Sequence, residues 1–154
     1  MHLTGTVLNS FALRAASDTD ARWIAELRAA VLKDDLERLG RYDPVRVRRR
    51  FLDGFNAGHT SVILVDGVEA GSIALRPDVD SQWIEHFYLD RRHQGRGLGG
   101  SVLADVMARH ADSRPFRLNV LAGSPAQRLY LRHGFTVESQ DPIDVYMVAP
   151  GRPA

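Results

Sequence analysis

A glycine-rich run between a strand-like and a helix-like segment is the feature that most constrains this chain. Residues 94–100 read Gln-Gly-Arg-Gly-Leu-Gly-Gly. Residues 83–89 before it are rich in aromatic and apolar side chains and predict a strand, and residues 98–111 carry apolar side chains at helical spacing. Glycines let the backbone approach a ligand closely, and the first amides of a helix are partly positive. The run therefore predicts a site for a phosphate or diphosphate group.

Other readings of this run are tested by the residues around it. Gly95, Gly97 and Gly100 satisfy the G-x-G-x-x-G pattern of dinucleotide-binding domains, which expects an acidic residue about 20 positions later, at the end of the next strand. The next predicted strand, residues 116–121, is followed by Ala-Gly-Ser and offers no carboxylate there. A Walker-type phosphate loop is excluded because no Gly-Lys-Ser/Thr occurs and Lys33 is the only lysine. A glycine turn that binds no ligand stays open as the plain alternative.

A second segment, residues 124–135, predicts a short helix with well-defined ends. It reads Ser-Pro-Ala-Gln-Arg-Leu-Tyr-Leu-Arg-His-Gly-Phe. Ser124 suits the N-cap and Pro125 the first helical position, while Gly134 suits the left-handed residue that ends a helix. One predicted helix and one predicted strand separate this segment from the glycine run.

Together the two segments resemble the GNAT family of N-acetyltransferases. The family's Q/R-x-x-G-x-G/A pattern is matched at Gln94, Gly97 and Gly99. Its N-x-x-A-x-x-x-Y-x-x-x-G-F pattern is matched at Ala126, Tyr130, Gly134 and Phe135. The resemblance is strong over residues 83–135. Its one departure is Ser124, which lacks the amide that the family's asparagine often directs at the pantetheine or thiol region.

The resemblance implies a binding site for acetyl-CoA as co-substrate and no metal. Backbone groups of Phe87 and Leu89 would pair with the pantetheine amides, and the amides of residues 94–99 would surround the diphosphate. The amide of Phe87, near a bulge that the resemblance implies in this strand, would also stabilise the oxyanion formed on the thioester. The residues implied in cofactor binding are Phe87, Leu89, Gln94, Gly95, Arg96, Gly97, Leu98, Gly99, Gly100 and Ser124.

Two residues are the candidates for proton transfer. Tyr130 stands at the family's tyrosine position, and a phenol that titrates near pH 10 is a reasonable proton donor to a thiolate whose acid titrates near 8.5. The plain alternative is an aromatic ring packed beneath its helix. Glu85 lies nine residues before Gln94, where many family members carry a glutamate that faces the amine. We expect Glu85 to act as the base, with an exposed strand-edge charge as the alternative and His86 in reserve.

Strand periodicity places the predicted base on one side of its strand. Side chains alternate along a strand, so Glu85 is expected to share a face with Trp83, Phe87 and Leu89, and His86 to lie on the opposite face.

The whole chain predicts one domain over residues 1–154, of α+β class, with a mixed sheet flanked by helices. The expected order is β-α-α-β-β-β-α-β-α-β-β, which is also the order of the GNAT fold. Asp43-Pro44 predicts the start of the second helix, and Asp66-Gly67 predicts a hairpin between two strands. Residues 150–154 are expected to form a frayed tail.

Composition limits the partners. The net charge of +1 does not call for a nucleic acid or an acidic membrane as partner. Arg46 and residues 48–50 are interpreted as a solvated helix face, with contact to acidic substrates or to the cofactor's ribose phosphate as the alternatives. There is no cysteine, and the six histidines show no metal-ligand spacing. No apolar run approaches the length of a membrane span, and the first residues lack the pattern of a signal peptide. We therefore expect a cytoplasmic protein, monomeric or homodimeric.

The predicted activity is direct transfer of an acetyl group from acetyl-CoA to a primary amine of a small molecule or peptide. No cysteine is available for a covalent intermediate, and no serine lies in a recognisable nucleophile setting. One alternative is a non-catalytic acyl-CoA sensor or interaction domain on the same fold. Another is a nicotinamide-binding domain.

Overall fold

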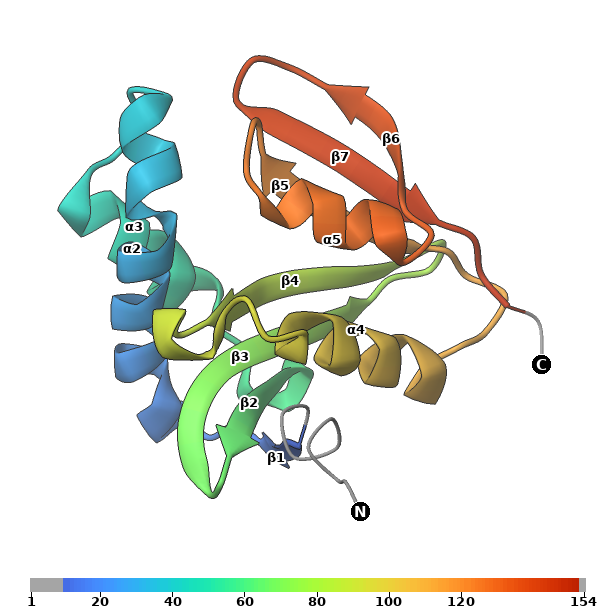
Figure 1. The fold of residues 1–154 in the computed structure, drawn as a ribbon, viewed down its shortest axis with the longest axis horizontal. Coiled ribbons are helices and arrows are strands. Elements are labelled where there is room, and N and C mark those ends of the chain that lie inside the picture. Colours follow the sequence, from blue (N-terminus) through green and yellow to red (C-terminus); the bar gives the residue numbers. More distant parts are fainter. Residues whose placement is uncertain (1–9, 153–154) are drawn as a thin grey trace. The chain divides into compact units, whose positions relative to one another are not determined.

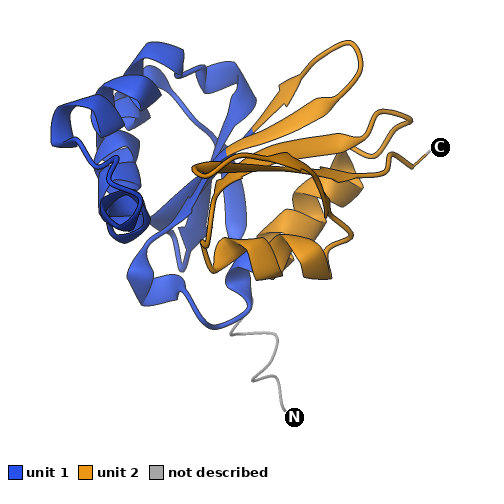
Figure 2. Ribbon diagram, turned by 90° about the horizontal axis from the view of Figure 1, so that it is seen from above, with its two compact units in different colours: residues 1–74, 86–99 blue, residues 75–85, 100–154 orange. Residues whose placement is uncertain are grey.

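The computed structural model describes residues 10–152, which fall into two compact units (Figure 2). The first unit contains the described residues up to Ala74 and the segment His86–Gly99. The second contains Leu75–Glu85 and the described residues from Gly100 onward. The expectation of one domain over residues 1–154 extends beyond the described part and stays a prediction.

Strands and helices follow one another in the predicted order (Figure 1). The strands are β1 (Ala12–Ala15), β2 (Thr60–Val65), β3 (Val68–Pro77), β4 (Gln82–Leu89), β5 (Phe116–Leu121), β6 (Thr136–Gln140) and β7 (Asp144–Ala149). The helices are α2 (Ala21–Arg38), α3 (Pro44–Gly54), α4 (Leu98–Arg109) and α5 (Ala126–Arg132), with short 3-10 turns at Asp18–Asp20, Ala57–His59 and Arg91–His93. The hydrogen-bonded strand order is β1-β2-β3-β4-β5-β7-β6. The predicted mixed α/β architecture is confirmed.

The helices of the first unit form because local signals and an apolar stripe agree. The Asp43 side chain accepts hydrogen bonds from the N–H groups of Val45 and Arg46, and Pro44 occupies the first helical position of α3. Buried side chains of α2, α3 and β4 make one apolar cluster, and these are Ile24, Ala25, Phe51 and Tyr88. The two predicted helices are thus anchored on the part of β4 that belongs to this unit.

A tight hairpin joins β2 and β3, as the Asp-Gly pair predicts. Asp66 and Gly67 both have positive φ, 53° and 78°, as the two central residues of a type I′ turn require. β2 pairs antiparallel with β1 and with β3, and the register of the second pairing shifts between Ile63 and Leu64. Local turn chemistry therefore decides how these strands connect.

In the second unit, β7 lies between β5 and β6 and pairs antiparallel with both. Alternate residues of β7 are buried, namely Val145, Met147 and Ala149. The parallel ladder between β4 and β5 joins two residue pairs, Gln82 with Phe116 and Trp83 with Arg117, at the start of both strands. Within the described part of this unit, no further ladder pair joins the two strands.

The end of the described chain lies against a loop of its own unit. The N–H of Arg152 donates to the carbonyl oxygen of Asp112 at 2.7 Å, and Gly151 passes so close to Ser113 that it has no room for a side chain. The remainder of the expected frayed tail, residues 153–154, lies outside the described residues. None of the described helices combines the length and the hydrophobicity that a membrane span requires.

Candidate active site

The glycine run forms the predicted connection between β4 and α4. Gly95 and Gly97 have φ values of 78° and 81°, a left-handed conformation in which a side chain is strained. The position of a Cβ on Gly95 is open, so this residue is required for its backbone conformation and not because a neighbour crowds it. Leu98, the first residue of α4, is buried.

Two side chains of this loop bind its own backbone. The side-chain amide of Gln94 donates to the carbonyl oxygen of Leu89 at 2.8 Å. An exposed hydrogen bond joins the Arg96 guanidinium to the carbonyl oxygen of Arg92 at 2.6 Å. Gln94 therefore ties the loop to the end of β4 and occupies one acceptor site of Leu89.

A backbone irregularity interrupts β4 at His86. Its φ is 49°, and its carbonyl oxygen accepts a hydrogen bond of 2.8 Å from the hydroxyl of Ser72, which is fully buried in β3. Tyr88 and Leu89 are both buried although they are consecutive. The regular alternation that places Glu85 on one face with Phe87 and Leu89 therefore does not run through the strand, because a left-handed residue interrupts it.

A polar network within the first unit surrounds this irregularity. The Tyr88 hydroxyl lies 3.1 Å from Nδ1 of His86 and accepts a hydrogen bond of 2.9 Å from Nε of Arg28. The His86 ring meets the Phe51 ring edge-on, with centroids 4.9 Å apart. Arg28 also donates to the carbonyl oxygen of Val47. Helices α2 and α3 thus hold the side chains on either side of Phe87 in place.

Glu85, the predicted base, belongs to the second unit and is paired there. Both of its carboxylate oxygens accept hydrogen bonds from the Arg76 guanidinium, at 3.1 and 3.0 Å. The Arg76 guanidinium also lies 5.6 Å from the centre of the Trp83 ring. Hydrogen bonding to Glu85 raises the pKa of Arg76 above its ordinary value. Glu85 keeps about a third of its side chain exposed, so it is neither deeply buried nor free of a partner.

Tyr130, the predicted acid, is buried in α5 of the second unit. Its ring packs against that of Phe135 with centroids 5.8 Å apart. The N–H of Phe135 donates to the carbonyl oxygen of Tyr130, and the N–H of Gly134 donates to that of Leu131, which ends the helix in a Schellman motif with Gly134 at φ 91°. The predicted helix stop at Gly134 is confirmed.

The start of α5 differs slightly from the prediction. The helix begins at Ala126, although Pro125 already has helical dihedral angles. The hydroxyl of Ser124 accepts a hydrogen bond of 3.2 Å from the N–H of Ala126. The serine that replaces the family's asparagine is therefore used in the turn that starts the helix.

Gly100, predicted to contact the cofactor, has a packing role in the structure. A Cβ at this position would lie 3.2 Å from Cε1 of His133 and 3.6 Å from Cδ1 of Leu129. Nδ1 of His133 lies 2.9 Å from the carbonyl oxygen of Leu129, which orients the imidazole. The glycine thus allows α4 and α5 to approach each other closely.

The predicted site residues fall into two groups, one in each unit. The first unit contains Phe87, Leu89, Gln94, Gly95, Arg96, Gly97, Leu98 and Gly99. The second contains Glu85, Gly100, Ser124 and Tyr130. Within residues 10–152, no cluster of three or more histidine, aspartate or glutamate side chains is arranged to hold a metal ion.

Sequence reasoning missed several residues that shape these groups. Ser72 had a local signal, since Gly71-Ser72 places two small residues inside an apolar strand. Arg28 also had one, because it lies four residues after Ile24 on the apolar stripe of α2. No local pattern indicates Arg76 or His133, whose partners depend on how strands and helices pair.

Comparison with known proteins gives one family and a set of similar folds. A family model described as "Acetyltransferase (GNAT) domain" matches residues 56–137. No curated protein matches the chain. Among solved structures, the PaiA N-acetyltransferase from Thermoplasma acidophilum, in complex with coenzyme A, is 17% identical with a TM-score of 0.71, covering 92% of this chain and 99% of that one.

Two further structures share this fold. An N-acetyltransferase from Staphylococcus aureus Mu50 is 18% identical with a TM-score of 0.68, covering 90% of this chain and all of that one. N-acetylglutamate synthase from Neisseria gonorrhoeae, complexed with coenzyme A and N-acetyl-glutamate, is 17% identical with a TM-score of 0.66. That match covers 93% of this chain and 35% of the larger enzyme. At such identities the likeness is one of fold.

Proposed function

The chain belongs to the GNAT acetyltransferase family, and from this premise we propose that it transfers an acetyl group from acetyl-CoA directly to a primary amine. The family match spans the predicted cofactor loop and the whole of α5. Two proteins of the same fold, from Thermoplasma acidophilum and Neisseria gonorrhoeae, are complexed with coenzyme A. These likenesses support an acyl-CoA as co-substrate and leave the amine to be identified.

The observation that carries the proposal is the left-handed glycine turn ahead of α4. Positive φ at Gly95 and Gly97 leads the backbone into the first turn of the helix, where amide dipoles favour an anion. We propose that this turn receives the diphosphate of acetyl-CoA. Phe87, next to the irregularity at His86, is proposed to direct its amide at the thioester oxygen.

In the proposed reaction, the neutral amine attacks the acetyl carbon, the new C–N bond forms and the C–S bond breaks. The proton lost from the amine goes to a base, and the departing thiolate takes a proton from an acid. Tyr130 is proposed as this acid, since it stands at the family's tyrosine position and its buried ring is packed against Phe135.

Glu85 is proposed as the base, and its pairing with Arg76 is not itself required for the reaction. Each carboxylate oxygen accepts one hydrogen bond from the guanidinium and keeps a second lone pair, through which Glu85 can accept a proton directly or through water. In the paired state the carboxylate still attracts an ammonium group.

Two measurements on the purified protein test the function. Calorimetry with acetyl-CoA measures binding, and the release of free thiol in the presence of a panel of amines measures transfer. The proposal expects binding together with amine-dependent thiol release. Binding without release for any amine would support the non-catalytic sensor, and absence of binding would overturn both.

A further inference from the structure

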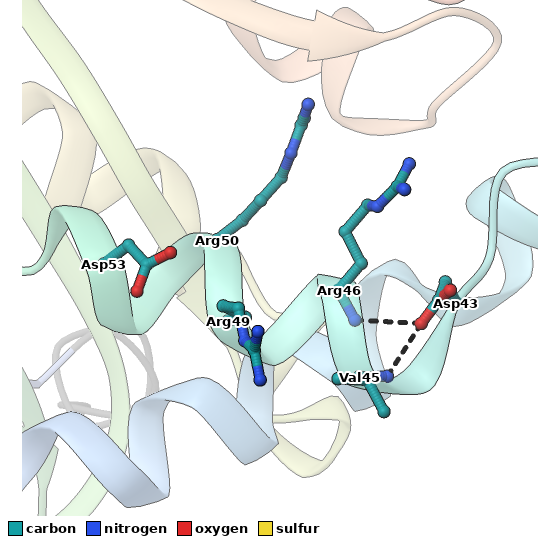
Figure 3. A pocket seen from close by; sticks show the side chains of 6 residues that line it. All are labelled: Asp43, Val45, Arg46, Arg49, Arg50 and Asp53. Atoms are coloured by element: carbon teal, nitrogen blue, oxygen red, sulfur yellow. Dashed lines mark hydrogen bonds between the residues drawn. The ribbon is translucent and has the colours of Figure 1, made fainter.

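One face of α3, with its N-terminal cap, lines an open hollow of about 430 Å³ in the first unit (Figure 3). The lining residues are Asp43, Val45, Arg46, Arg49, Arg50 and Asp53. Three of these six side chains are guanidinium groups. Two more are carboxylates, so the lining carries a net positive charge, on a helix that the predicted catalytic residues do not use.

Arg46 and Arg50 project to the same side of the helix. They are four residues apart, and Figure 3 shows both side chains extending away from α3 while Arg49 takes another direction. Like charges at this spacing destabilise a helix, and a cation near a helix N-terminus opposes the helix dipole. An anion bound between the two guanidinium groups relieves both effects.

The two carboxylates at the hollow offset only part of the charge of these arginines. Oδ1 of Asp43 accepts hydrogen bonds of 2.9 Å from the N–H groups of Arg46 and Val45, which lowers the pKa of Asp43 and commits it to capping the helix. Asp53 lies toward the C-terminal end of α3, away from the tips of the Arg46 and Arg50 side chains (Figure 3). Over residues 10–152, none of the three guanidinium groups forms an ion pair with a carboxylate of the chain.

Another arginine of the same helix shows the contrast. Arg48 donates from Nε and Nη2 to the two carboxylate oxygens of Glu26 on α2, at 2.7 and 3.0 Å. The chain thus supplies an ion-pair partner where α3 faces α2, whereas no carboxylate of the described residues forms an ion pair with Arg46 or Arg50. The unused charge is available to a ligand.

Planar guanidinium groups bind carboxylate and phosphate oxygens through paired N–H donors. The volume suits a small molecule or the end of a peptide side chain. The proposed diphosphate site, residues 94–99, does not line this hollow, so the anions to consider are the 3′-phosphate of acetyl-CoA and a group on the acceptor. The acceptor is favoured because α3 packs through Phe51 against His86, next to Phe87, which is proposed to contact the thioester. We propose, building on the proposed acetyl transfer, that Arg46 and Arg50 bind a carboxylate or phosphate group carried by the amine acceptor.

The test compares matched amines that differ in one charge. Glycine is paired with glycinamide, and O-phosphoethanolamine with ethanolamine, and kcat/KM is measured for each. The native protein should favour the anionic member of at least one pair by tenfold or more. The double variant Arg46→Gln/Arg50→Gln should lose this preference while its activity on the neutral amine is unchanged. Arg22→Gln, at an exposed arginine of α2, is the control and should keep the preference.

Each contrary result points elsewhere. Equal use of charged and neutral amines by the native protein, or the same loss in Arg22→Gln, would overturn the proposal. A loss confined to the KM of acetyl-CoA and absent with 3′-dephospho-acetyl-CoA would reassign the arginines to the cofactor's phosphate. If no amine is acetylated, the proposed function fails. The anion site is then tested separately, by measuring the binding of the same amines by calorimetry. The anion site is supported if the native protein binds the anionic amines selectively and the double variant does not. It is overturned if the native protein binds charged and neutral amines equally.

Discussion

Asp20 is a buried carboxylate at the start of α2 with several hydrogen-bond donors around it. Its side chain is buried, and its carboxylate accepts two hydrogen bonds of 2.9 Å from Arg14, one of 2.8 Å from the Trp23 indole and one of 2.9 Å from the N–H of Ser17. The pairing with Arg14, followed by the bonds from Trp23 and Ser17, holds the pKa of Asp20 far below its ordinary value. The carboxylate thereby joins β1 to the start of α2.

This network predicts a dependence of stability on pH. The pKa of Asp20 is lower in the folded than in the unfolded chain, so its contribution is complete above about pH 4 and decreases as the pH falls toward the folded-state pKa. Asp20→Asn should lower the free energy of unfolding by about 1–3 kcal/mol at pH 7 and by less at pH 3, measured by urea denaturation. Asp18→Asn, at an exposed position of the same turn, should change little. A loss as large at pH 3 as at pH 7 contradicts the argument.

Tyr130→Phe separates the packing of the ring from the chemistry of the hydroxyl. Phenylalanine keeps the contact with Phe135, so folding and acetyl-CoA affinity should be unchanged, while kcat falls by about 100-fold if the phenol protonates the thiolate. Calorimetry and steady-state kinetics give the two quantities. Tyr42→Phe, at a partly exposed tyrosine before α3, serves as the matched control. An unchanged kcat in Tyr130→Phe removes the acid role.

Glu85→Gln and Arg76→Gln together test the proposed base. Both changes break the same ion pair, but only the first removes a carboxylate. Glu85→Gln should lower kcat/KM by about 100-fold and alter the acidic limb of the pH–rate profile, whereas Arg76→Gln should retain most activity. Equal losses in the two variants mean that the pair is structural, and an unchanged profile in Glu85→Gln excludes it from the mechanism.

At the scale of elements, the close approach of β3 to β4 shapes the strand that carries Phe87. A Cβ on Gly71 would lie 2.2 Å from the carbonyl oxygen of Tyr88 and 3.2 Å from Cα of Leu89, both backbone atoms that cannot move aside cheaply. Ser72, the next residue, binds the carbonyl oxygen of His86. Two small residues of β3 therefore hold the irregular part of β4.

Replacing Gly71 should be far costlier than replacing a glycine with open space. Gly71→Ala is expected to lower the free energy of unfolding by about 1–3 kcal/mol or more, through backbone displacement. Gly54→Ala, at the end of α3 where no atom lies within 4 Å of the added Cβ, should be neutral or stabilising by up to about 1 kcal/mol. Urea denaturation of both variants gives the comparison. Similar values for the two would contradict the assigned contact.

Elements with signals inside their own segment agree with the sequence prediction. Asp43-Pro44 starts α3, Asp66-Gly67 turns the hairpin and Gly134 ends α5, because each of these depends on backbone sterics and hydrogen bonds within a few residues. The family resemblance implies a strand bulge near Phe87, but no signal within the segment places a left-handed residue at His86. A histidine with positive φ is favourable there only because β3 and two helices supply its partners.

At the scale of the whole molecule, ligand binding should be visible as stability. A ligand that binds only the folded chain raises the free energy of unfolding by about 2.7 kcal/mol when present at 100 times its Kd. Each kcal/mol added to the free energy of unfolding by acetyl-CoA should raise the Tm by about 2–4 °C. NAD should leave the Tm unchanged. Thermal denaturation with each ligand gives the result. A shift with NAD alone would favour the dinucleotide reading of the glycine run.

The order of strands and helices, the glycine turn ahead of α4 and the ends of α3 and α5 follow from short segments, since propensity, caps and turn sterics act over a few residues. The pairing of Glu85 with Arg76, the contact of Gly100 with His133 and the hydrogen bond from Ser72 to His86 arise only in the folded chain. Each of these contacts joins positions that are distant along the backbone. Its formation therefore depends on strand register and helix packing, which are determined by the free energy of the whole folded chain.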